Sequence, residues 1–286
     1  MQSRGHTGGG LQPHYSARTD VGRVREINED RVFAGELPAL TDHTGTSARH
    51  LLVVADGVGG LERGEWASEK ALTVVTAELP IHLANHEPRQ ALQLALEAAN
   101  QLIWRRERSD AELKLGPAAT TVVAVILDDV YLWWANVGDS RAYLVGQDRV
   151  QRLTRDHSWV EEQVRGGSLT PEQARVSGRR NVITRSIGFL PEVDVDTGGP
   201  VELRPTDVVV LCSDGLYGLL TDEDIAHVVR RYPSAEATER LVGLSNERGG
   251  TDNISVIVCG FIDRTTETGR ADTIDTGVTR QSSSAS

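Results

Sequence analysis

Short apolar runs bounded by polar residues or glycine recur through the middle of the chain. They lie at 51–55, 121–127, 130–137, 142–145, 208–212 and 254–259. Their content of β-branched and aromatic residues is typical of β-strands, and each run is shorter than most helices. Asp128 and Asp129 separate two of the runs by the spacing of a β-hairpin. The pattern therefore predicts a set of strands in which at least this pair is antiparallel.

Longer stretches carry apolar residues at helical spacing. One helical face collects Leu92, Ala95, Leu96, Ala99, Leu102 and Ile103. Residues 65–79, 222–231 and 235–245 are also predicted to be helical, with Thr221 as the N-cap of the second of these. Hairpin-linked strands in the middle, with helices in pairs outside them, indicate an α+β protein and not an alternating parallel one.

The two ends of the chain lack such patterns. Residues 1–13 have no periodicity and are expected to form a flexible N-terminal arm. Residues 264–286 are rich in Ser and Thr and can bury little apolar surface, so they are predicted to be a disordered tail. Residues 14–263 contain no evident linker or internal repeat, which predicts a single domain.

Composition and charge narrow the possible partners. The 286 residues are 39% hydrophobic and 25% charged, as is typical of a globular protein, and the formal net charge is −11. That charge disfavours nucleic acid and anionic membranes, because both would be repelled. A phosphorylated substrate would also be repelled unless a bound metal supplied local positive charge.

The cysteines and the apolar runs indicate where the protein works. Cys212 and Cys259 lie in apolar runs, which favours buried, reduced thiols. No secretory signal is visible, and no apolar run approaches the ~20 residues needed to span a bilayer. The expected location is the cytoplasm.

Acidic residues occur at the ends of the predicted strands. They are Asp56, Asp139, Asp214 and Asp252, each next to or near a glycine or a strand boundary. An Asp beside Gly commonly caps a turn, and this is the alternative at each position. Taken together, without a comparable set of bases, they favour a site for Mg²⁺ or Mn²⁺, which take oxygen ligands. The histidines show no HExxH-like spacing, which disfavours zinc hydrolase chemistry.

Two other polar features favour structural roles. His157, in the segment RDHS, is expected to make local hydrogen bonds. The basic run GRRN at 178–181 is expected to be a solvated loop, and holding a phosphopeptide or an acidic partner is its alternative role.

Several short motifs carry a family resemblance. They are REINED at 25–30, DGVGG at 56–60, GDSR at 138–141, SDGL at 213–216 and TDN at 251–253. Their order resembles that of the metal-dependent PP2C-type (PPM) protein phosphatases, and residues 153–188 resemble the flap segment of the bacterial branch. The resemblance covers residues 14–263 and implies a four-layer α-β-β-α sandwich, with two antiparallel sheets flanked by helix pairs.

The resemblance also implies a metal site. Asp56 matches a residue that bridges two cations, and the carbonyl of Gly57 matches a ligand of one of them. Asp214 and Asp252 match ligands of the other cation. Asp139, together with Asp214, matches the position of a third, weaker metal in bacterial members. The implied cofactors are two Mn²⁺ or Mg²⁺ ions, which would activate a water for attack on phosphorus.

Further positions match residues that handle water and phosphate. Glu29 and Asp30 match acids that hold metal-bound waters, and Arg25 matches the residue that binds the substrate phosphate. The chain departs from many eukaryotic members at Val58, where they have a His proposed as a general acid. It also has Ala119 where a Gly is usual.

The implied activity is hydrolysis of phosphoserine and phosphothreonine by a monomeric enzyme that opposes Ser/Thr kinases, with phosphorylated proteins as its partners. One alternative is a catalytically inactive phosphoprotein-binding domain, which the presence of all four strand-end acids disfavours. Another is a dedicated phosphatase for one regulator protein of a stress circuit. Such proteins usually carry sensory domains, for which this chain has no room. A two-metal nuclease is disfavoured by the acidic charge.

Overall fold

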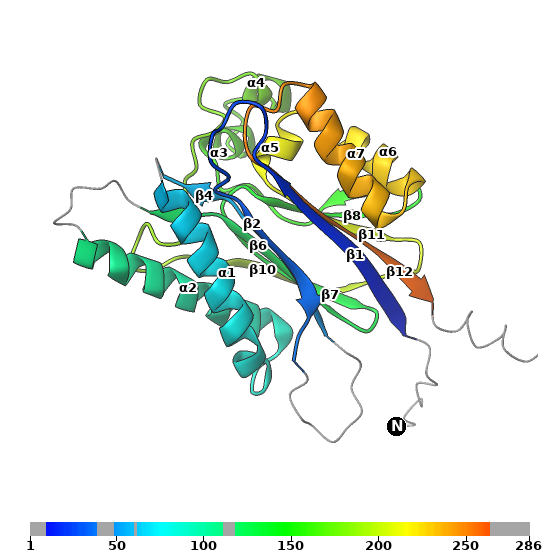
Figure 1. Ribbon diagram of the computed structural model, residues 1–286, viewed down its shortest axis with the longest axis horizontal. Helices are drawn as coiled ribbons and strands as arrows, with labels where there is room; N and C mark the ends of the chain where they lie inside the picture. Colours follow the sequence, from blue (N-terminus) through cyan, green and yellow to red (C-terminus); the bar gives the residue numbers. More distant parts are fainter. Residues whose placement is uncertain (1–9, 39–48, 60–61, 111–117, 264–286) are drawn as a thin grey trace, which may run out of the picture.

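The computed structural model describes residues 10–38, 49–59, 62–110 and 118–263. Within these ranges, a pair of five-stranded antiparallel sheets packs face to face (Figure 1). The first sheet has the order β1-β12-β11-β8-β9, formed by Leu11–Asp20, Ile254–Asp263, Val208–Cys212, Arg141–Val145 and Val150–Arg152. The second has the order β10-β7-β6-β3-β2, formed by Asp196–Glu202, Tyr131–Val137, Val122–Asp128, His50–Ala55 and Arg31–Glu36. A short ladder joins β4 (Gly57–Val58) to β5 (Ala119–Thr120).

Helices cover the outer face of each sheet. The pair α1 (Glu62–Leu83) and α2 (Pro88–Asp110) packs on the second sheet, and α6 (Asp222–Arg231) and α7 (Ser234–Glu247) pack on the first. The short helices α3 (Trp159–Arg165), α4 (Pro171–Arg175) and α5 (Asp214–Tyr217) lie together towards one end of the sandwich. The predicted four-layer α-β-β-α architecture is confirmed.

The apolar runs are continuous because the central strands are covered on both faces. In β3, Leu52 and Val54 face the space between the sheets, whereas Leu51 and Val53 pack with the α1–α2 layer. The exposed fraction of all four side chains is 0%. Cys212 and Cys259 are buried free thiols, as predicted.

Local signals at the turns and caps are largely borne out. Thr221 caps α6, with its hydroxyl accepting from Asp224 N–H and the Asp224 carboxylate accepting from Thr221 N–H. The β6–β7 hairpin is present, but Asp128 pairs with Tyr131, so the loop is displaced by one residue from the predicted pair. Asp129 takes a positive φ of 54°, a conformation that Asp tolerates better than most residues.

The predicted N-terminal arm is too long. β1 begins at Leu11, and residues 11–13 pair with residues 261–263 of β12, because the edge of the first sheet offers them backbone partners. Residues 1–9 and the predicted tail at 264–286 lie outside the described residues. No helix within the described ranges is long and apolar enough to cross a membrane.

Candidate metal and phosphate site

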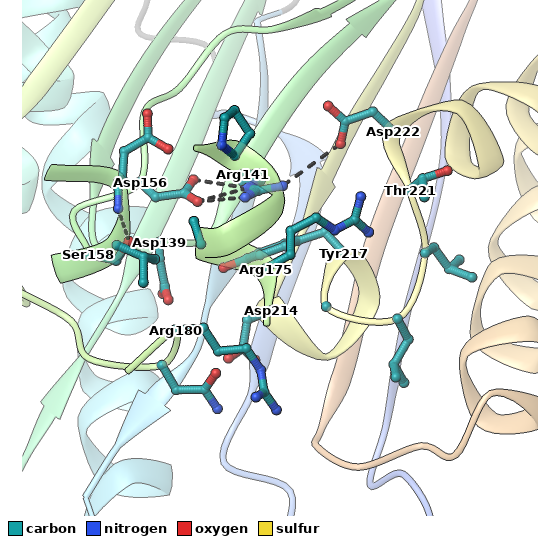
Figure 2. A pocket seen from close by; sticks show the side chains of 18 of the residues that line it. Asp139, Arg141, Asp156, Ser158, Arg175, Arg180, Asp214, Tyr217, Thr221 and Asp222 are labelled. Carbon is teal, nitrogen blue, oxygen red and sulfur yellow. Dashed lines mark hydrogen bonds and ion pairs between the residues drawn. The ribbon is translucent and has the colours of Figure 1, made fainter. Parts of the chain in front are cut away.

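Strand ends bring the predicted acids to one end of the sandwich. Asp56 follows β3 directly, and Asp139 lies two residues beyond β7. Asp214 opens α5 just after β11, and Asp252 comes two residues before β12. Figure 2 shows Asp139 and Asp214 at the same cavity, which Asp252 also lines.

The electrostatics of these carboxyls show that they share a small volume. Burial, and then the charges of Asp30, Asp214, Asp139 and Asp252, raise the pKa of Asp56 well above its usual range. The pKa of Asp214 is raised well above the usual range by burial and then by Asp139, Asp252 and Asp30. Each ionised carboxylate therefore destabilises the others unless positive charge is brought among them.

The pKa of Asp139 is also raised, but the neighbouring charge that contributes most is that of Asp156. Burial, and next the charge of Asp156, raise its pKa to about 6, while a hydrogen bond from the Tyr217 hydroxyl lowers it. Tyr217 itself lies beneath Arg141, whose guanidinium carbon is 3.6 Å from the ring centroid. The Asp139 carboxyl is thus held from the α5 side.

The loop before β2 adds Glu29 and Asp30. Asp30 is 1% exposed, and burial raises its pKa to about 6. Its Oδ2 accepts from the Ser213 hydroxyl at 2.8 Å, but its buried Oδ1 has no donor among the described residues. Burial also raises the pKa of Glu29. An unpartnered carboxylate oxygen in such a place costs free energy unless a ligand satisfies it.

Gly57 lies where no side chain fits. A Cβ there would lie 2.3 Å from the carbonyl oxygen of Gly64 and 2.7 Å from that of Glu29. Glycine is required because the start of α1 and the loop before β2 approach the backbone at this point.

Arg25 is placed at the rim of the acids. Its Nη2 donates to Oδ2 of Asp252 at 2.8 Å, and its side chain is 49% exposed. Arg25 therefore pairs with Asp252 and not with an acid of its own REINED motif.

Sequence reasoning missed the threonines that fix Asp56. Thr121 Oγ1 accepts from the N–H of Asp56 at 3.2 Å and lies 2.7 Å from the Ser140 hydroxyl. The hydroxyl of Thr120 donates to the carbonyl oxygen of Asp56 at 2.8 Å. Both side chains are fully buried. They directly follow Ala119, where related phosphatases usually have Gly, and this departure in the sequence could have drawn attention to them.

Asn253 was also missed, although the TDN motif contains it. Its Oδ1 accepts from Glu29 N–H at 2.8 Å, and its Nδ2 donates to the carbonyl oxygens of Val21 and Ile27 at 3.0 and 2.9 Å. One side chain thereby fixes the loop that carries Arg25.

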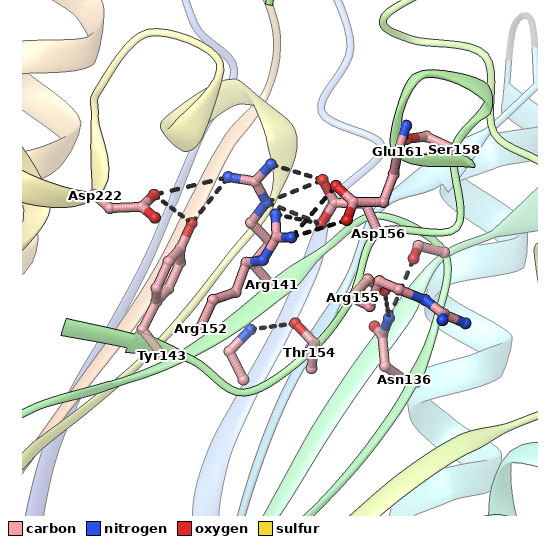
Figure 3. Close-up of polar contacts among 12 residues, drawn as sticks. Asn136, Arg141, Tyr143, Arg152, Thr154, Arg155, Asp156, Ser158, Glu161 and Asp222 are labelled. Atoms are coloured by element: carbon pink, nitrogen blue, oxygen red, sulfur yellow. Dashed lines mark hydrogen bonds and ion pairs between the residues drawn. The ribbon is translucent and has the colours of Figure 1, made fainter. Parts of the chain in front are cut away.

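The base of the flap segment is tied to the Gly138–Asp139 turn. Arg141 makes a bidentate contact with Asp156, at 2.9 Å through Nε and 2.6 Å through Nη2 (Figure 3). The N–H of Gly138 donates to Nδ1 of His157 at 3.0 Å, and His157 N–H donates to the Gly138 carbonyl oxygen. The structural role expected for His157 is confirmed.

The donor set at this site fits hard divalent cations. Among the described residues, no three His, Cys, Asp or Glu side chains already form a set that could hold a metal ion. Arg25 instead engages Asp252, and Ser213 engages Asp30. The converging carboxyls nonetheless all offer oxygen ligands, and several have raised pKa values. Two of their buried oxygens, Oε1 of Glu29 and Oδ1 of Asp30, have no hydrogen-bond donor among the described residues. These features suit Mg²⁺ or Mn²⁺.

The protein is thus a sandwich of two antiparallel sheets between helix layers, with buried carboxylates at one end. The family model "Protein phosphatase 2C" matches residues 18–254. Protein phosphatase PhpP of Streptococcus pneumoniae is 36% identical over 245 residues, covering 84% of this chain and 94% of PhpP.

Solved structures agree with this assignment. The serine/threonine phosphatase of S. agalactiae superposes with a TM-score of 0.76 at 32% identity, covering 87% of this chain and 99% of that one. The catalytic domain of the phosphatase PstP, in complex with two manganese ions, superposes with a TM-score of 0.71 at 33% identity. The match covers 88% of this chain and 100% of the PstP chain. The chain belongs to the protein phosphatase 2C family. It is a protein-serine/threonine phosphatase, and its substrates are phosphorylated proteins.

Proposed function

We propose that this phosphatase hydrolyses phosphoserine and phosphothreonine with the help of two divalent cations, Mn²⁺ or Mg²⁺, and that it opposes Ser/Thr kinases. The convergence of buried carboxyls with raised pKa values carries the proposal. Asp56 and the Gly57 carbonyl hold one cation, and Asp56, Asp214 and Asp252 hold the other. The structure of the PstP catalytic domain in complex with two manganese ions supports the kind and number of the cations by analogy.

In this proposal the remaining acids bind water molecules or a third cation. Glu29 and Asp30 hold waters at the edge of the site, which suits the unpartnered Oδ1 of Asp30. Asp139, with Asp214, forms a third and weaker cation site, consistent with the charge of Asp139 raising the pKa of Asp214.

In this site, bound cations would lower the pKa of a water towards neutrality, so that it can act as the nucleophile, and would offset the charge on the phosphate. The chain's own role is to orient the phosphate. Arg25, at the rim and half exposed, donates from its planar fork to phosphate oxygens. Val58 offers no proton to the leaving group.

The test uses metal-stripped enzyme and a phosphothreonine peptide. We expect turnover to require added Mn²⁺ or Mg²⁺ and to stop with chelator. Asp56→Ala, Asp214→Ala and Asp252→Ala should nearly abolish turnover, whereas Asp139→Ala should mainly raise the metal concentration required. Full turnover by stripped enzyme in excess EDTA would exclude the metal mechanism. An Asp139→Ala variant with the wild-type metal requirement would remove the third site.

A further inference from the structure

A cavity of about 640 Å³ continues from the acids into the space between the flap helices and the α5–α6 turn. Asp139, Asp214 and Asp252 lie at the acid end (Figure 2). One wall is formed by α3, α4 and the loop after α4, and the other by residues 217–223. The cavity extends well beyond the space that a single phosphate needs, so it can also receive the residues flanking the phosphorylated one.

The four arginines that line this cavity fall into two groups. Arg141 and Arg152 are both paired, with Asp156 as a shared partner at 2.6 and 3.5 Å. Arg175 and Arg180 are exposed and have no side-chain hydrogen bond or ion pair with any described residue. The two unpaired guanidiniums therefore face the cavity with their donors available (Figure 2).

The part of the flap wall that follows α3 is basic in a protein that is otherwise acidic. Glu161 of α3 also lines the cavity, but it is paired with Arg152 at 3.3 Å. Between residues 163 and 190 the chain carries only one acid, Glu172, and five arginines, which are Arg165, Arg175, Arg179, Arg180 and Arg185. The whole chain has a formal net charge of −11. Such a local reversal of sign attracts anions to this wall.

The opposite wall has the opposite character. Glu223 is exposed at the start of α6, and Asp222 accepts from the Tyr143 hydroxyl at 3.1 Å. An acidic group on the substrate would be repelled by this wall and attracted to the flap wall. The charges thus select both a ligand class and the side of the cavity where it binds.

We propose that Arg175 and Arg180 bind a second acidic group of the substrate, close in sequence to the phosphorylated residue. The inference rests on the proposed function and adds a substrate class to it. The group is either a carboxylate or another phosphate, because both match the guanidinium donors. The basic run at 178–181 then has a recognition role in addition to being a solvated loop.

The test compares phosphothreonine peptides that differ only in their flanking residues. An extended peptide advances about 3.3 Å per residue, so one Glu, phosphoserine or Lys is scanned over about four positions on each side of the phosphothreonine. We expect kcat/KM to be about fivefold higher for the best Glu or phosphoserine position than for the Ala peptide. The two acidic arms show which anion is preferred.

Variants assign the preference to the flap wall. Arg175→Ala/Arg180→Ala should bring the ratio of acidic to neutral peptide close to one, and Arg175→Glu/Arg180→Glu should shift the preference to the Lys peptides. A misfolded variant could not gain a new preference. Arg165→Ala is the matched control, because Arg165 is an exposed flap residue outside the cavity lining, and it should keep the wild-type ratio.

The outcomes separate this inference from the proposed function. Metal-dependent turnover without any preference for acidic flanks would overturn the second subsite and leave the phosphatase mechanism standing. A preference that survives in both double variants would also overturn it. Metal-independent turnover would count against the proposed mechanism instead.

Discussion

Arg25 illustrates at the scale of one residue how the site handles charge. Its guanidinium pairs with Asp252, and its side chain is half exposed at the rim. The hydrogen bond from Arg25 to Asp252 is the main reason that the pKa of the guanidinium is raised, with the charges of Asp252, Glu29 and Asp214 adding to it. Arg25 therefore carries a permanent positive charge that pairs with Asp252 and that should also attract a substrate phosphate.

Replacing Arg25 with Ala should weaken phosphate capture without weakening metal binding. Loss of a hydrogen bond to a charged group costs about 1.5–3 kcal/mol, so kcat/KM should fall by about 10- to 150-fold. The Mn²⁺ concentration for half-maximal activity should stay the same or decrease, since Arg25 no longer competes for Asp252. Steady-state kinetics combined with a metal titration measures both quantities.

Arg25→Lys is the control for charge alone. It should recover only a fraction of the loss, because an ammonium cannot reproduce the guanidinium fork. Unchanged kcat/KM at saturating metal in Arg25→Ala would contradict the phosphate role. A higher metal requirement would instead indicate that Arg25 mainly supports the metal site.

At the scale of elements, burial decides which strands the sequence could predict. Strands such as β3 and β6 are apolar on both faces and stand out in the sequence. β1 and β2 are edge strands with mixed, partly exposed side chains, and β10 contains Gly198, Gly199 and Pro200 and a break in its register. These three strands owe their conformation to pairing with their neighbours, which local sequence does not reveal.

Local sequence likewise revealed some residues of the site and not others. The acids were predictable because each follows or precedes an apolar run in the chain. Thr121 and Asn253 were not singled out, because they act on backbone groups 65 and 224 residues away. Tyr217 was missed for a similar reason, since only the fold stacks it beneath Arg141.

Thr121→Val tests whether the β5–β6 junction positions Asp56. The substitution keeps the shape but removes the partner of the Asp56 N–H and the Ser140 hydroxyl. We expect a loss of about 1–3 kcal/mol in the free energy of unfolding, together with a higher Mn²⁺ concentration for half-maximal activity. Denaturant unfolding and a metal titration provide the two measurements.

Thr76→Val is a suitable comparison. Among the described residues, the Thr76 hydroxyl bonds only to carbonyl oxygens of its own helix α1, so its loss should leave the metal requirement unchanged. If Thr121→Val loses stability but keeps the wild-type metal requirement, Thr121 supports the fold without positioning Asp56.

At the scale of the whole molecule, the acid site is a source of instability that cations should relieve. Burial raises the pKa of Asp30 and of Asp139 to about 6 and raises the pKa of Asp56 and of Asp214 well above the usual range. The folded protein therefore binds more protons here than the unfolded chain does. Below about pH 4 both states are protonated and these groups contribute nothing. The destabilisation grows above that pH and, for Asp30 and Asp139, is fully present above about pH 6.

Thermal unfolding with and without Mn²⁺ should reveal this linkage. If the ionised carboxylates hold Mn²⁺ as proposed, the metal should stabilise the fold in proportion to the logarithm of its concentration over Kd. Below about pH 6 protons compete with the metal, so the rise in Tm caused by millimolar Mn²⁺ should be larger at pH 7 than at pH 5.

In the metal-free protein, Asp139→Asn removes one buried charge and should raise the free energy of unfolding at pH 7 by about 1–3 kcal/mol. The same variant should show a smaller Mn²⁺ shift, because a ligand has been lost. A Tm that is indifferent to Mn²⁺ at both pH values would show that the carboxylates do not act as one cation site.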